Sequence, residues 1–230
     1  MDKRTISIIM PTCNEEAIIE RTLQTLLAIT ERSEGVEIIV SDASTDRTPD
    51  IISGFPVTLC RSAKGRAIQM NNGARLAGGD ILYFLHADTL PPDTFIDDIR
   101  SAAASGKKAG CFRMHFDDDH PLMTLFGWCT RFPLMICRGG DQSLFIDRAL
   151  FQGIGGFDET LLIMEDYDII TRIEQSEPFH ILETEVTTSA RKYHQNGIIP
   201  LQLTFGTLHL MHLLGFDQEA IIRHYRENII

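Results

Sequence analysis

The chain is 230 residues long, which is enough for one domain with a single substantial hydrophobic core. Its composition, 43% hydrophobic and 23% charged, excludes a disordered, fibrous or disulfide-scaffold protein. The net charge of −11, from 21 basic and 32 acidic residues, disfavours DNA or RNA as a partner, because an acidic surface gains nothing from counterion release.

Cysteine usage and hydropathy indicate in which cellular compartment the protein is expected. Five cysteines form no CxxC pair and no zinc spacing, so we expect reduced thiols. The first residues lack the apolar core of a signal peptide, and the most apolar late stretch, Ile198 to Phe216, is interrupted by Pro200, Gly206 and two histidines. We therefore expect a cytoplasmic protein, with peripheral contact on the inner membrane face as an open alternative.

The first part of the chain alternates short apolar runs with helical patterns. The apolar runs predict strands over Ile6 to Met10, Val36 to Val40, Val57 to Cys60 and Ile81 to Leu85. Helices are predicted from Glu15 onward, after the polar turn at 42–46, over Gly65 to Leu76 and from Pro91 to Ser105. This alternation implies right-handed crossovers, so we predict an α/β fold with a mostly parallel central sheet flanked by helices.

The second part is less regular. Its patterns predict a strand over Cys111 to Phe116, an apolar helical stretch over Pro121 to Cys137, a helix over Glu165 to Glu174 and a strand near Phe179 to Leu182. The last thirty residues predict two helices. Because the chain shows no internal repeat and no linker, we predict a single domain over residues 1–230.

Polar residues follow each of the four predicted strands. They are Pro11 to Glu15, Ser41 to Asp46, Lys64 to Arg66 and His86 to Thr89. In open parallel sheets, ligands bind outside the carboxyl ends of the strands. One polar turn is ordinarily a turn or a helix cap, but four at the same edge of a sheet indicate a ligand site.

The residue types narrow the ligand. Asp42 can accept a hydrogen bond from a base or a ribose, and Lys64 and Arg66 can meet phosphate charge. Asp88 follows a buried strand, where an unpaired carboxylate is costly, so we expect it to coordinate Mg²⁺ or Mn²⁺. Such an ion would neutralise a diphosphate leaving group. The alternative is that Asp88 caps the helix after Pro91.

These segments resemble the signatures of family 2 glycosyltransferases, which have the GT-A fold. The resemblance runs in order from about Thr5 to Tyr193 and rests on the segments Pro11 to Glu16, Ser41 to Thr48, Lys64 to Gly73, His86 to Asp88, Gly155 to Glu159 and Glu165-Asp166. His86-Ala87-Asp88 occupies the place of the family's DxD motif, with His86 where an acid is expected.

A narrower resemblance rests on three further segments. Leu85 to Asp88, Gly140 to Gln142 and Thr188 to Arg191 are together similar to a small bacterial subgroup associated with arsenosugar biosynthesis. The QxxRW signature of processive polysaccharide synthases is absent, because Glu165-Asp166 is followed by Ile169 to Arg172. A single transfer is therefore expected rather than repeated sugar addition.

The family resemblance implies roles for individual residues. A nucleotide site would contain Pro11, Thr12, Asn14, Glu15, Asp42, Lys64 and Arg66. Asp88 and His86 are the candidate metal ligands, and Arg191 is a candidate diphosphate clamp. The acceptor and sugar side would contain Asp141, Gln142, Gly156 and Glu165, with Asp166 as the general base.

The role of Asp166 also follows from the chemistry of the expected reaction. An inverting transfer needs a carboxylate that takes the proton of the acceptor hydroxyl. The alternative for Glu165-Asp166 is a pair of acids at a helix N-terminus, where the helix dipole favours them. For Arg191, the alternative is a basic run that is simply solvated.

The predicted function is an inverting glycosyltransferase that moves a sugar from a UDP- or GDP-sugar to a small-molecule or lipid-linked acceptor. Residues 1–105 would be the nucleotide-binding half, 106–193 the acceptor and catalytic half, and 194–230 the C-terminal helices. A nucleotidyltransferase is disfavoured, because the first strand is not followed by a glycine-rich loop with arginine and lysine. A non-catalytic sugar-nucleotide binding module stays open because of His86.

Two late stretches, 121–137 and 198–216, are unusually apolar. Apolar helices are most often core, so we expect them to cover the sheet and line an acceptor groove. The sharper alternative is a surface that faces lipid or forms a homodimer.

Overall fold

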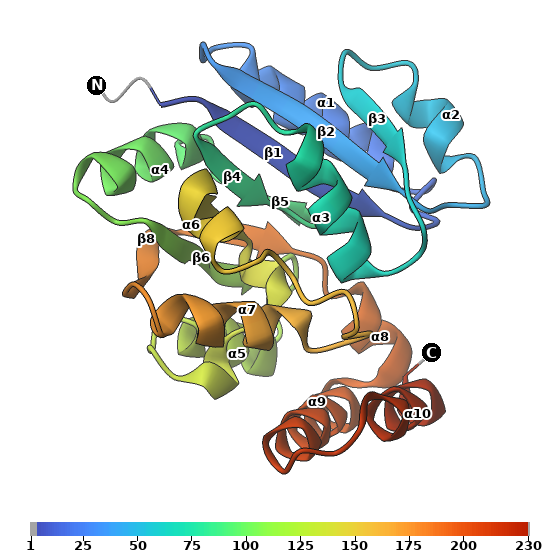
Figure 1. Ribbon diagram of the computed structural model, residues 1–230. Helices are drawn as coiled ribbons and strands as arrows, with labels where there is room; N and C mark the ends of the chain where they lie inside the picture. The colour runs from blue at the N-terminus through green and yellow to red at the C-terminus, as the bar shows by residue number, and fades with distance from the viewer. Residues whose placement is uncertain (1–3, 230) are drawn as a thin grey trace.

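The computed structural model describes residues 4–229, which form an eight-stranded sheet with helices on both faces (Figure 1). The strands are β1 (Ile6–Thr12), β2 (Val36–Asp42), β3 (Thr58–Arg61), β4 (Ile81–Phe84), β5 (Thr89–Leu90), β6 (Ala109–Phe116), β7 (Leu144–Asp147) and β8 (Phe179–Thr188). They lie in the order β3-β2-β1-β4-β7-β6-β8-β5.

Two halves of the sheet differ in strand direction. β3, β2, β1 and β4 pair in parallel, as the alternation of strands and helices predicted. β7 is antiparallel to both β4 and β6, β6 and β8 are parallel, and β5 is antiparallel to β8. The prediction of a mostly parallel sheet in an α/β domain is therefore confirmed, with a mixed second half.

Most of the helices cover the two faces of the sheet. They are α1 (Ile19–Thr30), α2 (Thr48–Ile52), α3 (Arg66–Leu76), α4 (Phe95–Ala104), α5 (Pro121–Cys129), α6 (Arg148–Gly153), α7 (Glu165–Glu174), α8 (Arg191–Asn196), α9 (Ile198–Leu213) and α10 (Gln218–Asn228). In Figure 1, α3, α6 and α7 lie in front of the sheet, while α9 and α10 lie at its lower end.

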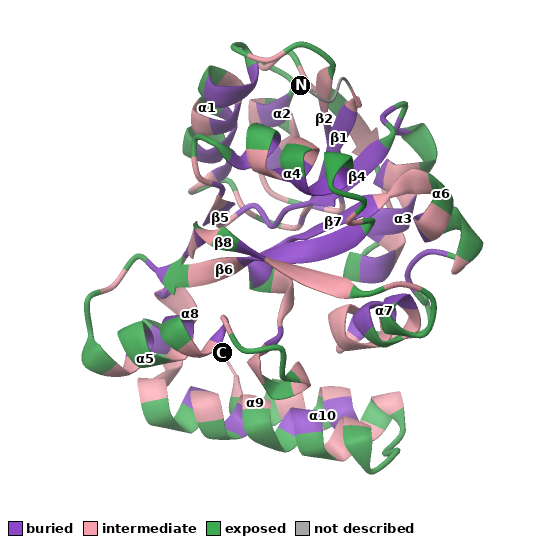
Figure 2. Ribbon diagram, turned by 90° about the vertical axis from the view of Figure 1, so that its left-hand side faces the viewer, coloured by how far each residue is buried: buried purple, intermediate pink, exposed green. Residues whose placement is uncertain are grey.

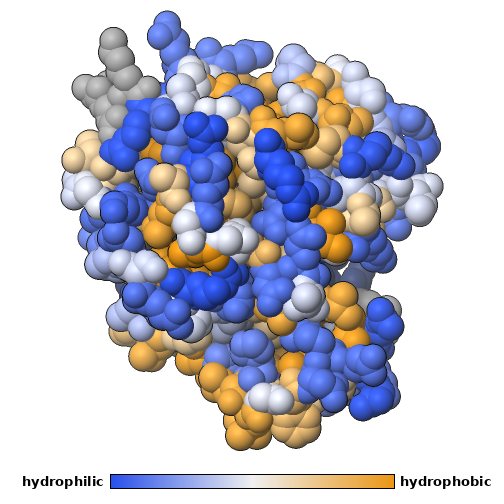
Figure 3. Space-filling model, viewed as in Figure 1, coloured by the Kyte–Doolittle hydropathy of each residue, from blue (hydrophilic) through white to orange (hydrophobic). Residues whose placement is uncertain are grey.

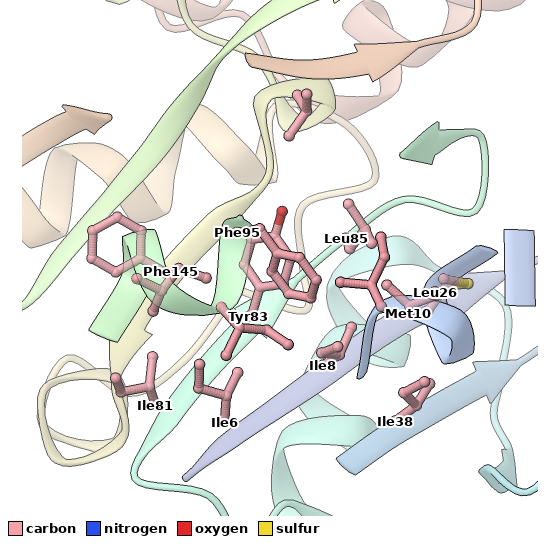
Figure 4. Packing of buried hydrophobic residues seen from close by; sticks show 14 of the residues in the cluster. Ile6, Ile8, Met10, Leu26, Ile38, Ile81, Tyr83, Leu85, Phe95 and Phe145 are labelled. Carbon is pink, nitrogen blue, oxygen red and sulfur yellow. The ribbon is translucent and has the colours of Figure 1, made fainter. Parts of the chain in front are cut away.

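Strand alternation builds a core on each face of the sheet. Ile6, Ile8 and Met10 of β1 are fully buried against α1 and α4, whereas Ile9 points to the opposite face. Figure 4 shows the first of these cores, where the rings of Tyr83 and Phe95 stack with centroids 5.4 Å apart. On the other face α3 packs closely on β1, because a Cβ at Gly73 would lie 2.4 Å from Ile9 Cγ2.

A third, smaller core holds the C-terminal helices. Met123 of α5, Tyr193 of α8 and Leu201 of α9 are buried together beside the end of β6. In Figure 2 the strands are largely buried, while α9 and α10 present much exposed surface. These helices therefore rest on the domain rather than cover the sheet, contrary to the expectation for 198–216.

Some predicted boundaries were wrong. The stretch 121–137 is not one helix: α5 ends at Cys129, and only Met135–Cys137 returns to a short 3-10 turn. Pro133 stands between them, and proline removes a helical hydrogen bond and clashes with the preceding turn. The strands β5 and β7 and the helix α6 were not predicted, because short segments carry too little periodicity.

Candidate active site

The loops that follow β1 and β2 form one wall of a site at the carboxyl ends of the parallel strands. Asp42, the last residue of β2, is fully buried. Its carboxylate accepts hydrogen bonds from Thr12 Oγ1 at 2.9 Å and Ser44 Oγ at 2.5 Å, and it pairs with the guanidinium of Arg61. The structure thus places Asp42 where it ties three strand ends together.

Asn14 links the same two loops. Its backbone N–H donates to Ser44 Oγ at 2.7 Å, and its side-chain Oδ1 accepts from the backbone N–H of Thr45 at 2.9 Å. Asn14 has a φ of 59°, a conformation that costs free energy in a residue other than glycine. The loop is therefore held in a fixed shape, with Thr12 buried beneath it.

Arg61 is a residue of this wall that the sequence analysis did not single out; the buried Gln69, which donates to the backbone oxygens of Thr12 and Ser41, is another. It ends β3, one of the strands whose carboxyl ends were expected to carry ligand-binding groups. The predicted strand ends one residue earlier, at Cys60, so Arg61 was not among the residues expected at the site. Lys64 itself is exposed, in the loop before α3.

Glu15, Asp88 and Arg191 meet at the mouth of the site. Arg191 Nη2 lies 3.3 Å from Glu15 Oε2. Burial raises the pKa of Glu15, the cation of Arg191 opposes this, and the negative charge of Asp88 adds to it. The pairing of β5 with β8 joins Thr89 to Thr188, and the backbone N–H of Ser189, two residues before Arg191, donates to the backbone oxygen of Asp88 at 3.2 Å.

His86, Asp88 and Asp141 form a cluster of possible metal ligands. One ligand atom from each lies within 4.8 Å of the other two, and His86 Nδ1 is 3.0 Å from Asp141 Oδ1. Burial would raise the pKa of Asp141, but the hydrogen bond and charge of His86 outweigh it and hold that pKa below its usual range. The alternative that Asp88 caps the following helix does not hold, because the N-cap of α4 is Thr94.

Asp166 stands opposite this cluster, in the first turn of α7. Its neighbour Glu165 is buried and accepts a hydrogen bond from Arg66 Nη1 at 3.0 Å, while Asp166 Oδ2 is 3.8 Å from the same nitrogen. Burial, together with the charge of Glu165, raises the pKa of Asp166 to about 6, although Arg66 and His86 pull it down. Arg66, predicted to bind the nucleotide, is instead paired with the acids of α7.

Gly140 allows the metal-ligand cluster to approach Asp166. A Cβ on this residue would lie 2.3 Å from Asp166 Oδ2 and 2.6 Å from His86 Cε1, so no other residue fits without displacing them. Ser143 and Met164, which flank the two segments, have φ values of 61° and 70°. Left-handed backbone at residues other than glycine concentrates at functional sites, where the surrounding structure enforces it.

Three other predicted site residues have different surroundings. Pro11 lies within β1, opposite Ser41 of β2. Gln142 is buried and donates from Nε2 to the backbone oxygen of Phe112, which anchors the turn that carries Asp141. Gly156 lies at a separate groove of about 760 Å³ between α3 and α6, where it is packed against Asn71.

Comparisons with known proteins identify the family of the chain. The sequence model described as Glycosyl transferase family 2 matches residues 7–147, and the chain belongs to this family. It is 31% identical over 163 residues to a validoxylamine A glucosyltransferase of Streptomyces hygroscopicus subsp. limoneus, an alignment that covers 63% of this chain and 35% of the relative.

A second relative is the probable glycosyltransferase YdaM of Bacillus subtilis, which is 27% identical over 197 residues, 73% of this chain and 46% of the relative. The chain therefore spans less than half the length of both relatives.

Solved structures share the fold. A mannosyltransferase from Pyrobaculum calidifontis, in complex with GDP-Man and Mn²⁺, superposes with a TM-score of 0.67 at 21% identity, covering 91% of this chain and 62% of that one. TarS of S. aureus in complex with UDP-GlcNAc gives 0.64 at 18% identity, covering 80% and 58%. The expectation of a GT-A-like fold is confirmed.

Proposed function

We propose that this chain is an inverting glycosyltransferase that moves a sugar from a UDP- or GDP-sugar to an acceptor hydroxyl in a single transfer. One observation carries the proposal: in a family 2 chain, Asp166, with its pKa raised to about 6, faces the cluster of His86, Asp88 and Asp141 across the close approach at Gly140. A base and a candidate metal site thus share one cleft.

Asp166 is the proposed general base. A carboxylate with a pKa near 6 is ionised at neutral pH and is more basic than an ordinary aspartate, so it is better matched to taking a proton from a hydroxyl. The negative charge of Glu165 helps to raise the pKa of Asp166, and Arg66 pairs with the buried carboxylate of Glu165. The proton of the acceptor hydroxyl passes to Asp166 as the hydroxyl oxygen bonds to the sugar carbon and the bond to the diphosphate breaks.

The wall around Thr12, Asn14 and Asp42 is proposed to bind the nucleotide. Its loops are preorganised by hydrogen bonds between β1 and β2, and preorganisation lowers the entropic cost of binding. Arg191 is placed to leave Glu15 and pair with a diphosphate, which suits its proposed role as a clamp. Two proteins of similar fold were solved in complex with GDP-Man and UDP-GlcNAc, which supports a nucleotide-sugar as the donor.

A divalent metal, Mn²⁺ or Mg²⁺, would be held by His86, Asp88 and Asp141. The residues fit such an ion, because one imidazole nitrogen and two carboxylates converge there. The bound metal would supply positive charge to stabilise the diphosphate as it leaves. Asp141, predicted to face the acceptor, is in this proposal a ligand.

The donor is tested by thermal shift with a panel of nucleotides, with and without Mn²⁺. Metal-dependent stabilisation by UDP or GDP is expected, because a ligand that binds only the folded state raises its stability. Asp166→Asn should retain this shift and lose donor hydrolysis by about 10² to 10⁴-fold. Glu174→Gln, an exposed acid at the end of the same helix, should change neither.

The same experiment separates the alternatives. Hydrolysis that survives in Asp166→Asn would exclude this residue as the base, and a shift without any hydrolysis or transfer would indicate a non-catalytic binding module. For the acceptor, the resemblance to the arsenosugar-associated subgroup makes small arsenosugar precursors the first class to screen, followed by lipid-linked acceptors.

A further inference from the structure

Exposed hydrophobic side chains gather on α5, the segment 130–137, α9 and the residues 214–216 that follow it, at the lower end of the molecule (Figure 3). We call this surface the apolar face and define it by Leu125, Trp128, Phe132, Leu134, Ile136, Ile199, Leu203, Leu210, Leu213, Leu214 and Phe216. Side chains of the same elements, Met123 and Leu201, pack together in the third core. The helices α5 and α9, which carry much of the face, are therefore packed against one another at the same end of the domain.

The exposed stripe on α9 has helical spacing. Ile199, Leu203 and Leu210 recur on one side of the helix, opposite the buried Leu201 and Leu208. The segment 194–216 contains no aspartate, glutamate, lysine or arginine, whereas the next helix, α10, carries four such residues. An apolar side of a helix is stable when another apolar surface covers it. The charged residues of α10 show how this chain builds a helix that faces water.

The charge distribution indicates what covers the face. Residues 121–140 and 194–216 contain no acid, although the chain has 32. At the margin of the face, the guanidinium of Arg131 lies 5.0 Å from the ring centroid of Trp128, whose ring is 4.8 Å from that of Phe132. Tryptophan and arginine side chains are suited to a membrane–water interface, because the apolar part of each side chain can enter the lipid while its polar end stays in water.

We propose that the apolar face docks the protein on the surface of a lipid bilayer. Because residues 121–140 and 194–216 contain no acid, this face can approach anionic lipid headgroups without local repulsion, although the whole chain has a net charge of −11. Within residues 4–229, no helix is long and apolar enough to cross a membrane. The 16 residues of α9 span about 24 Å, less than the hydrocarbon core of about 30 Å, so the helix lies on the bilayer.

The face is physically joined to the catalytic helix. Tyr167, next to Asp166, donates from its hydroxyl to the backbone oxygen of Arg138 at 2.8 Å, and its ring lies 4.8 Å from that of His209 on α9. Arg138 in turn donates to the backbone oxygen of Thr130 at 2.7 Å. A docked protein would thus hold its cleft next to the membrane, and the docking itself does not depend on the proposed transfer reaction.

Vesicle flotation of the full chain tests the docking. Phosphatidylcholine vesicles, with and without phosphatidylglycerol, should carry the protein with little dependence on salt, because the contact is apolar. Trp128 is the one tryptophan of the chain and is 46% exposed, so its emission should shift to the blue on docking and be quenched by brominated lipid. No flotation and no shift would overturn the proposal.

Substitutions locate the docking surface. Leu203→Glu and Ile136→Glu, at side chains 67% and 64% exposed, should each weaken vesicle binding about tenfold or more while the unfolding transition stays unchanged. The matched control is Leu76→Glu, at a leucine 53% exposed at the end of α3, which should bind like the wild type. Equal loss in the control would refute the assignment. So would a wild-type dimer that Leu203→Glu dissociates without any vesicle binding.

Discussion

The two walls of the cleft handle buried charge in opposite ways. On the proposed nucleotide wall, formed by Thr12, Asn14 and Asp42, the fully buried Asp42 has hydrogen bonds from Thr12 and Ser44 and an ion pair with Arg61. On the proposed catalytic wall, formed by Glu165 and Asp166, both acids lie near the cation of Arg66, and the pKa of Asp166 is raised to about 6 by burial and by Glu165. The first wall is a framework, and the second stores electrostatic free energy.

This difference fits the two roles proposed for the walls, nucleotide binding for the first and proton transfer for the second. A loop that must hold a nucleotide gains from satisfied polar groups, because each one left unpaired when buried costs stability. A general base gains from an environment that does not fully stabilise its anion, because that environment makes it more basic. We therefore expect substitutions on the nucleotide wall to act mainly on stability and substitutions on the catalytic wall mainly on rate.

Removal of the Asp42 carboxylate should give the largest loss of stability. Asp42→Ala leaves Thr12 and Ser44 without their buried acceptor, and we expect the free energy of unfolding to fall by about 2 to 3 kcal/mol. Urea denaturation measures this loss. Glu31→Ala, at an exposed position after α1, should stay within about 0.5 kcal/mol of the wild type. A loss no larger than that of the control would contradict the description of this wall as a framework.

The pH dependence of donor hydrolysis tests the catalytic wall. Asp166 must be ionised to act as a base, so the rate should be level above its pKa of about 6 and fall about tenfold for each pH unit below it. Glu165→Gln removes the repulsion that helps to raise this pKa and frees Arg66, so the midpoint should move to lower pH. An unmoved midpoint would show that Asp166 is not the titrating group.

The same wall should become more stable when its strained charge is removed. The folded pKa of Asp166 lies above its ordinary value of 3.8, so the ionised form is disfavoured by folding. Asp166→Asn should therefore raise the melting temperature of the metal-free protein by about 2 to 4 °C at pH 8, about 1 kcal/mol for a chain of this size. The gain should be complete above pH 6 and vanish below pH 3.8. An Asp166→Asn variant that is less stable than the wild type at pH 8 would contradict the description of this wall as electrostatically strained.

Metal preference should give the smallest change. Imidazole favours transition metals over Mg²⁺, so we expect Mn²⁺ to support donor hydrolysis better than Mg²⁺ in the wild type. His86→Asp should lower the ratio of the two rates several-fold. His120→Asp is the control, since this exposed N-cap of α5 accepts a helix hydrogen bond that aspartate can also accept. The same ratio in both variants would exclude His86 as a ligand.

The parallel half of the sheet could be predicted from the sequence almost entirely. Apolar runs alternating with helical patterns specify parallel crossovers, and the carboxyl ends of such strands must lie at one edge. Thr12 and Asp42 were placed there correctly, because β1 and β2 pair in register as neighbours in the sheet. The helix Glu165–Glu174 was also predicted with its observed bounds.

The other half depended on contacts that no local pattern encodes. Arg66 was expected at the nucleotide but reaches Glu165, and Asp141 was expected at the acceptor but reaches His86. Both pairs join residues far apart in the chain. They meet because the short strand β7, which was not predicted, pairs with β4, and because α7 packs on the same face of the sheet as α3.

The sequence by itself therefore determined the fold, the edge of the sheet at which the site lies, and which carboxylates were candidates. Residue spacing suffices for this, because local periodicity and crossover handedness are properties of neighbouring residues. Only the tertiary structure decided which charges are paired and which stay strained. The pKa of Asp166 depends on its burial and on its distances to Glu165 and Arg66, and those arise when α3 and α7 pack on the same face of the sheet.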